Sequence, residues 1–160
     1  MQIAGIPAHP LMVHAAVVLV PLALLGYLGL LWRVEGRRTY GWLVTGVAVA
    51  GAVAAILAAQ SGESLEHALR LASGARPQFG EHPDQGDTAE FLSVAFGAAV
   101  VALWGLERFG ARWPLPAWTP TALYVLGALV GLAATGMIVV AGHSGATLAW
   151  DTLGTFVKPK

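Results

Sequence analysis

Four long segments of the chain carry almost no charge, and this feature limits the possible folds more than any other. The segments cover roughly residues 11–32, 41–59, 89–106 and 121–141. A helix needs about 20 apolar residues to cross the hydrocarbon core of a bilayer, and none of the four segments contains Lys, Arg or Asp. The sequence therefore predicts four transmembrane helices.

The composition of the chain agrees with this interpretation. Hydrophobic residues make up 56% of the 160 residues and charged residues only 11%, more apolar surface than a soluble domain of this size can bury. The formal net charge is zero, which argues against nucleic acid as a partner. The chain has no cysteine, which excludes disulfides, thiolate metal sites and covalently attached heme. We expect an all-α integral membrane four-helix bundle, with residues 1–160 forming a single transmembrane domain in the lipid bilayer.

The two halves of the chain open and close with similar polar motifs. The first half opens with His9-Pro10 followed by His14, and the second with His82-Pro83 followed by Asp87 at the same spacing. The apolar hairpins end in Gln60-Ser61-Gly62 and His143-Ser144-Gly145 respectively. The sequence thus predicts a bundle built from two similar helical hairpins.

The segment between the second and third spans has soluble character. Leu65, Ala68, Leu69 and Ala72 recur at the spacing of one helical face, which predicts a short amphipathic surface helix over about 64–73. Asp87 precedes Thr88 near the start of the third span and is suited to capping that helix. A capping role and a ligand role for Asp87 are both open at this point.

Arginines near the ends of the spans predict the orientation of the protein. Arg33, Arg37 and Arg38 lie between the first two spans, and Arg108 and Arg112 lie between the last two. Basic residues in short loops favour the cytoplasmic side. We therefore expect a multi-pass protein of the cytoplasmic membrane with both termini on the extracytoplasmic side.

All five histidines fall on the predicted extracytoplasmic side, because successive spans alternate in direction, and we expect a histidine-rich pocket at that end of the bundle. His14 lies about one helical turn deeper than Pro10, and ionisable groups at such depth often mark a functional site. A neutral histidine that only hydrogen-bonds a neighbouring helix is the alternative for His14, and a simple interfacial role is the alternative for His143. For His82 and His9, a turn or cap role is the alternative to a ligand role. His67 is expected to be solvated.

Glycines on the second and fourth spans also allow two interpretations. They are Gly41, Gly46, Gly51, Gly127, Gly131 and Gly136. Small residues at such positions let membrane helices approach closely, and they could also make room for a flat cofactor. The spacing of Gly127 and Gly131 favours helix packing.

The opening and closing motifs resemble those of a bacterial membrane protein family, domain of unknown function 2231. Members open with Leu-Pro-x-His-Pro-x-x-Val-His, which is similar to the stretch from Gly5 to His14. Ser61-Gly62-Glu63, the stretch from His82 to Asp87, and Gly142-His143-Ser144-Gly145-Ala146 followed by Trp150 also resemble the family. The resemblance implies a four-helix integral membrane protein of bacteria. The family is in turn similar to four-helix di-heme cytochromes b, but those have histidines on both membrane sides, so the resemblance implies at most one heme.

Three functions fit these residues. The leading hypothesis is a b-type heme held by His14 and His143, which would make the protein an electron-transfer subunit working with a quinone or a larger membrane redox complex. The second is a zinc or copper ion bound by members of the set His9, His14, His82, Asp87 and His143. The third is a cofactor-free accessory or assembly subunit, including one that forms a homo-oligomer. We expect no independent catalytic activity, because no nucleophile and base pair is recognisable.

Overall fold

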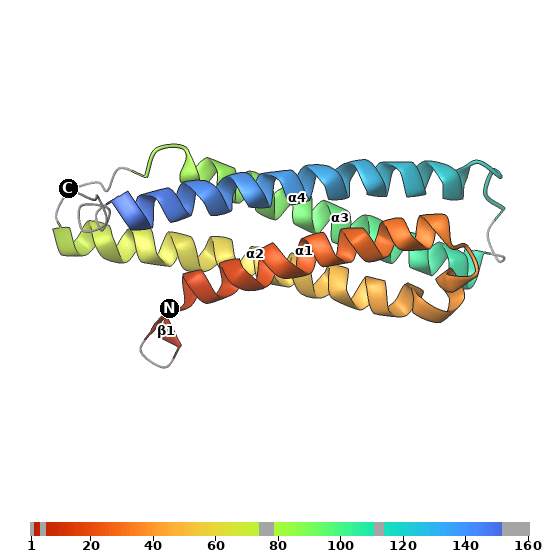
Figure 1. Ribbon diagram of the computed structural model, residues 1–160, viewed down its shortest axis with the longest axis horizontal. Coiled ribbons are helices and arrows are strands. Elements are labelled where there is room, and N and C mark those ends of the chain that lie inside the picture. Colours follow the sequence, from red (N-terminus) through yellow and green to blue (C-terminus); the bar gives the residue numbers. More distant parts are fainter. Residues whose placement is uncertain (1, 4–5, 74–78, 111–113, 152–160) are drawn as a thin grey trace, which may run out of the picture.

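Four long helices make up most of the protein in the computed structural model, which describes residues 2–3, 6–73, 79–110 and 114–151 (Figure 1). They are α1 (Ala8–Trp32), α2 (Gly36–Ser73), α3 (His82–Phe109) and α4 (Thr119–Asp151). Ahead of α1, the two-residue strands β1 (Gln2–Ile3) and β2 (Ile6–Pro7) pair antiparallel. Each of the four helices is long and apolar enough to cross a membrane. The predicted all-α membrane bundle is confirmed.

The helices form a four-membered ring in which each helix packs against two others. The neighbouring pairs are α1 with α2, α2 with α3, α3 with α4, and α4 with α1, and the last of these seams is the least extensive. Large apolar side chains such as Val18, Leu25 and Leu129 point outward and are more than half exposed. An apolar exterior of this kind suits a lipid environment rather than water.

Helices α2 and α3 are longer than the spans predicted from hydropathy. Residues 64–73 are helical, but they continue α2 without a break instead of forming a separate surface helix. The segment lacks proline and is rich in strong helix formers, so the backbone hydrogen bonding of α2 has no reason to stop.

Helix α3 begins at His82 with Pro83 in its first turn, a position that proline tolerates well. Asp87 therefore lies inside α3, and the predicted capping role for it is wrong.

The two hairpins bury equivalent positions, which confirms that the bundle is built from a structural repeat. Five buried residues of α1 each have a buried counterpart on α3, 73 residues further along the chain: Ala16, Val20, Ala23, Leu24 and Tyr27 match Ala89, Ser93, Phe96, Gly97 and Val100. Five of α2 likewise have counterparts on α4, 83 residues further along: Gly41, Val44, Ala48, Gly51 and Ala55 match Tyr124, Gly127, Gly131, Ala134 and Ile138. The similarity of the halves therefore extends well beyond the short motifs at their ends.

Most of the conspicuous glycines serve helix packing. A Cβ atom at Gly131 would lie 2.8 Å from both Leu24 and Phe96, and one at Gly51 would lie 2.9 Å from Val20. Gly127 contacts the phenol of Tyr27. Neighbouring side chains thus already fill the space beside these three glycines, as expected for small residues at membrane helix interfaces.

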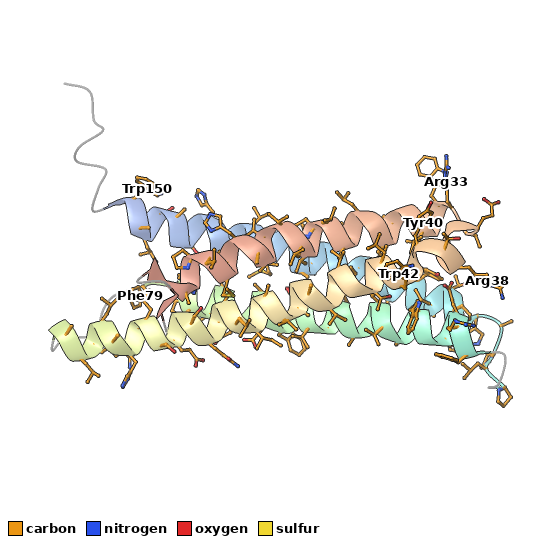
Figure 2. All side chains as sticks on the ribbon, turned by 90° about the horizontal axis from the view of Figure 1, so that it is seen from below. Arg33, Arg38, Tyr40, Trp42, Phe79 and Trp150 are labelled. Carbon is orange, nitrogen blue, oxygen red and sulfur yellow. The ribbon has the colours of Figure 1, made fainter. Side chains whose placement is uncertain are left out.

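The two ends of the bundle differ in chemistry. We call the end where α1 and α3 begin the histidine end, because His9 and His82 lie there, and the opposite end the tyrosine end, because Tyr27 and Tyr124 lie near it. Figure 2 shows Arg33, Arg38, Tyr40 and Trp42 grouped at the tyrosine end, with Trp150 at the other end. Tryptophan and tyrosine with nearby arginine are typical of membrane interfaces.

Candidate functional site

In the first hairpin, the His9 side chain reaches from the first turn of α1 to the backbone of α2. Its Nδ1 lies 2.8 Å from the carbonyl oxygen of Ala58. Because a carbonyl can only accept, Nδ1 must carry the proton. The buried Ser61 hydroxyl donates to the same carbonyl at 2.9 Å, and a Cβ at Gly62 would lie 3.1 Å from His9 Cε1. A small residue at position 62 therefore lets the imidazole approach α2 closely.

The second hairpin repeats this arrangement with equivalent residues. His82 on α3 places Nδ1 2.9 Å from the hydroxyl oxygen of Ser144 on α4, and that hydroxyl donates to the carbonyl of Ala141 at 3.1 Å. The hydroxyl proton is thus already committed, so its oxygen accepts from Nδ1–H of His82. A Cβ at Gly145 would lie 2.8 Å from His82 Cε1. The opening and closing motifs identified in the sequence therefore contact each other within each hairpin.

The two imidazoles also meet each other across the bundle. The ring centroids of His9 and His82 lie 6.4 Å apart, and the ring planes are nearly perpendicular at 79°. Both rings are half-buried. Within the described residues, neither Nε2 atom has a hydrogen-bond partner. The site therefore presents two imidazoles in the same tautomer, each with a free Nε2 lone pair.

The other histidines lie on the outside of the bundle. His14 is exposed, and its Nδ1 lies 2.6 Å from the carbonyl of Pro10 one turn earlier. His143 is also exposed, on α4. A Cβ at Gly142 would lie 3.9 Å from Val17, so His14 and His143 occupy similar levels of the α1–α4 seam. They face outward rather than into the interior.

Asp87 and His67 do not join the histidine pair. Asp87 is exposed on α3, and His67 is exposed on the part of α2 that extends beyond the start of α1. Over the described ranges, no group of three or more His, Asp or Glu side chains is arranged to hold a metal ion. Of the five residues predicted as metal ligands, the fold brings together His9 and His82.

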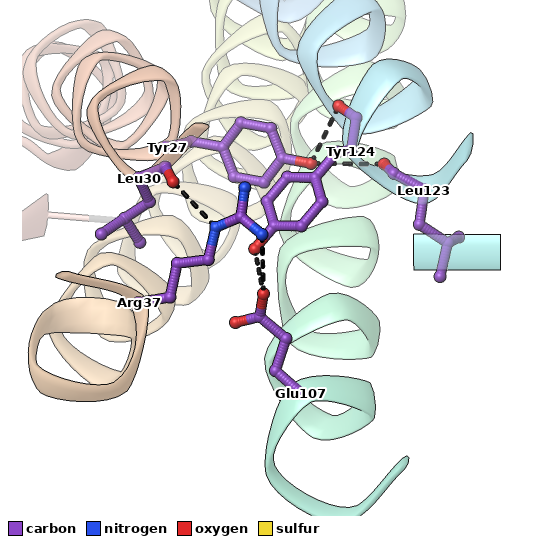
Figure 3. A network of polar contacts seen from close by, with 6 residues as sticks. All are labelled: Tyr27, Leu30, Arg37, Glu107, Leu123 and Tyr124. Atoms are coloured by element: carbon purple, nitrogen blue, oxygen red, sulfur yellow. Dashed lines mark hydrogen bonds and ion pairs between the residues drawn. The ribbon is translucent and has the colours of Figure 1, made fainter. Parts of the chain in front are cut away.

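The tyrosine end holds a polar network that the sequence interpretation did not anticipate (Figure 3). Arg37 on α2 donates from Nε to the carbonyl of Leu30 at 2.9 Å, and its Nη1 lies 3.4 Å from the carboxylate of Glu107 on α3. The guanidinium carbon lies 3.9 Å from the centre of the Tyr124 ring on α4, and the Tyr124 hydroxyl donates to Glu107.

Tyr27 brings α1 into this network. Its hydroxyl lies 3.2 Å and 3.1 Å from the carbonyl oxygens of Leu123 and Tyr124. The network therefore draws on all four helices. The cavity beside it measures about 20 Å³, which suffices for roughly one water molecule and not for a cofactor.

Comparison with known proteins supports the membrane class. The chain matches, over residues 5–157, the family described as predicted membrane protein (DUF2231). It belongs to this family. No curated protein and no solved structure matched the chain.

In this DUF2231 chain, the family motifs contribute to two different surfaces. His9 of the opening motif and Ser144 of the closing motif lie at the contacts inside the bundle. His14 and His143, from the same two motifs, face outward. Sequence spacing identified all four residues. Only the helix packing shows that His9 and Ser144 lie inside the bundle and that His14 and His143 lie on its outside.

Proposed function

We propose that this integral membrane protein binds a transition-metal ion, zinc or copper, between His9 and His82. The observation that carries the proposal is the pairing of two half-buried imidazoles from equivalent positions of the two hairpins, 6.4 Å apart, each with a free Nε2. The arginines of the short loops predict that this histidine end is extracytoplasmic.

The separation of the rings is compatible with one shared ion. With each Nε2 about 2.1 Å from the ion, each ring centroid lies about 3.2 Å from it, so the centroids are about 5.2 Å apart at a tetrahedral N–metal–N angle and about 6.4 Å apart at a linear one. The observed 6.4 Å corresponds to a near-linear arrangement, and tetrahedral zinc would require the rings to approach each other by about 1 Å. Water or an exogenous ligand would occupy the remaining coordination positions.

The hydrogen bonds at Nδ1 also support a ligand role. Histidine ligands of metal ions commonly donate their other ring N–H to a backbone carbonyl, a carboxylate or water, and this fixes the tautomer and the ring orientation. Nδ1 of His9 donates to the Ala58 carbonyl, and Nδ1 of His82 donates to Ser144, itself held by the Ala141 carbonyl. Both rings are thus held in the tautomer that leaves Nε2 free for an ion.

The same hydrogen bonds would serve a cofactor-free subunit, in which they only join the helices of each hairpin. Substitution with asparagine separates the two roles. The Asn amide can still donate in place of Nδ1–H, but Asn has no atom in place of Nε2. We therefore choose His9→Asn and His82→Asn, with His67→Asn as the matched control because His67 is exposed on α2 away from the pair.

The test is metal binding by the purified full chain in detergent, measured by titration with zinc and copper and by metal analysis after dialysis. We expect about one ion per chain, an affinity lowered roughly tenfold or more in His9→Asn and in His82→Asn, and no change in His67→Asn. Thermal unfolding of the metal-free variants should stay close to that of the metal-free parent. Unchanged metal affinity in both pair variants would contradict the proposal.

A second candidate is a b-type heme held by His14 and His143. The hydrogen bond from His14 to Pro10 leaves its Nε2 free, and both residues are exposed at similar levels of the α1–α4 seam. The room beside Gly127 and Gly131 is not open to a porphyrin, because Tyr27, Leu24 and Phe96 occupy it. A heme held by these histidines would therefore lie on the outer face of the bundle, covered by lipid, a partner subunit or a second copy.

An absorption spectrum decides between the heme and the ion. After expression with sufficient heme, a Soret band that disappears in His14→Asn and in His143→Asn but persists in His9→Asn would support the heme. Bound zinc or copper without a Soret band supports the ion. Neither signal in the parent protein would leave an accessory or assembly subunit as the function.

A further inference from the structure

Each of the two histidines is followed, three residues later on its helix, by a residue with a side-chain atom that can bind a metal ion. Met12 follows His9 by three residues on α1, and Gln85 follows His82 by three residues on α3. Residues three apart share a helix face, and three residues correspond to a rise of about 4.5 Å. Met12 and Gln85 are therefore equivalent in the repeat and lie one layer deeper than the imidazoles.

The burial pattern places both residues on the faces that form the core. Met12 falls midway between the buried Ala8 and Ala16, four residues from each. Gln85 lies four residues before the buried Ala89. Both Met12 and Gln85 are themselves half-buried. The two side chains therefore extend from the same faces as the histidines that meet across the bundle.

Gln85 has a buried polar atom without a partner. Its Oε1 is buried and accepts no hydrogen bond from any described residue, while its amide nitrogen donates to Glu81 at 3.5 Å. Buried polar atoms in native proteins nearly always have a partner. The amide oxygen is thus an acceptor, one turn from His82, that is open to a metal ion or an ordered water.

We infer that the ion between His9 and His82 is copper, with the Met12 thioether and the Gln85 amide oxygen as additional weak ligands. This inference rests on the proposed function. Thioether sulfur is a soft ligand that favours copper(I), whereas zinc is held by imidazole, thiolate and carboxylate. Imidazole nitrogen suits copper, and the thioether adds a soft donor that favours copper(I).

The decisive variant is Met12→Leu, because leucine has a similar volume and no sulfur. Met137→Leu is the matched control, since Met137 is a half-buried methionine of α4 that lies seven residues, about two helical turns, before Ser144. The probes are copper(I), measured by competition with a chromophoric chelator, and zinc(II), measured by titration. X-ray absorption of the copper-loaded protein reports directly whether sulfur is bound.

We expect the parent to bind copper(I) more tightly than zinc(II). Met12→Leu should weaken copper(I) binding roughly tenfold, leave zinc(II) affinity within about twofold, and remove the sulfur signal, whereas Met137→Leu should change none of these. A Gln85→Leu variant should weaken copper(II) binding more than copper(I), since the amide oxygen is a hard ligand.

The possible failures are distinguishable. Tighter zinc binding in the parent, or equal losses of copper and zinc affinity in Met12→Leu, would overturn the copper assignment while the His9 and His82 site stands. Absence of any bound metal in the parent would overturn both the assignment and the proposed function. Copper binding with a sulfur signal that survives Met12→Leu would overturn the role of Met12.

Discussion

Tyr27 of α1 occupies the space that a side chain at Gly127 of α4 would need. The ring carbon Cζ of Tyr27 lies 2.8 Å from the position of a Cβ on Gly127, and the hydroxyl lies 3.1 Å from the Tyr124 carbonyl. In the first hairpin, the position equivalent to Gly127 is Val44. At the tyrosine end the two hairpins therefore differ: the second has glycine where the first has valine, and Tyr27 packs against this glycine and holds α1 against α4.

Substitution of Gly127 should therefore destabilise the bundle. We expect Gly127→Ala to lower the free energy of unfolding by about 1–3 kcal/mol, because the rigid phenol has to move. Gly136→Ala on the same helix has nothing within 4 Å of its Cβ, and should be neutral or stabilising by up to about 1 kcal/mol. Denaturation in mixed detergent micelles measures both. Equal losses in the two variants would show that general helix effects, and not the Tyr27 contact, control stability.

Substitution of the glycines beside the two imidazoles should weaken metal binding to different extents. A Cβ would lie 2.8 Å from His82 in Gly145→Ala but 3.1 Å from His9 in Gly62→Ala. We expect both variants to displace the imidazole and weaken metal binding, with the larger effect for Gly145→Ala. Gly46→Ala, which has open space around its Cβ, is the control. The prediction is wrong if Gly46→Ala impairs metal binding as strongly as the other two.

The contact between Arg37 and Glu107 should couple the two hairpins energetically. A double-mutant cycle with Arg37→Met and Glu107→Gln should give a coupling energy of about 0.5–3 kcal/mol, since the side chains are 19% and 28% exposed and share a network with Tyr124. The pair Arg70 and Glu66 is an i, i+4 pair within one helix, with Arg70 46% exposed, and should give only about 0.3–0.5 kcal/mol. A coupling at Arg37 no larger than at Arg70 would mean that the network adds nothing to hairpin association.

The orientation of the bundle can be tested directly, because the chain has no cysteine of its own. We predict that Glu63→Cys, near the histidine end, reacts with a membrane-impermeant maleimide in intact cells. Glu35→Cys, in the short connection between α1 and α2, should react only after the membrane is permeabilised. The reverse pattern would place the histidine end in the cytoplasm.

The histidine site shows where prediction from sequence stops. Spacing alone identified His9, His14, His82 and His143 as one group on one side of the membrane. His9 and His14 are five residues apart, which on a helix corresponds to about 140° of rotation. They cannot both face the same core, and the buried stripe through Ala8, Ala16 and Val20 shows that His9 faces inward. Helix α1 carries hydrophobic residues on every face, so its sequence has no polar face from which the rotation of the helix about its axis could be predicted.

The sequence by itself determined the four spans, the repeat and the polar motifs that open and close each hairpin. These features depend on local properties, namely apolar length, helix propensity and the repetition of short motifs. The tertiary structure decided which imidazoles meet and that Arg37 contacts Glu107 across 70 residues of chain. Those outcomes depend on the rotation and relative height of packed helices, which are fixed only when side chains such as Tyr27 and Phe96 fit against glycines of the neighbouring helix.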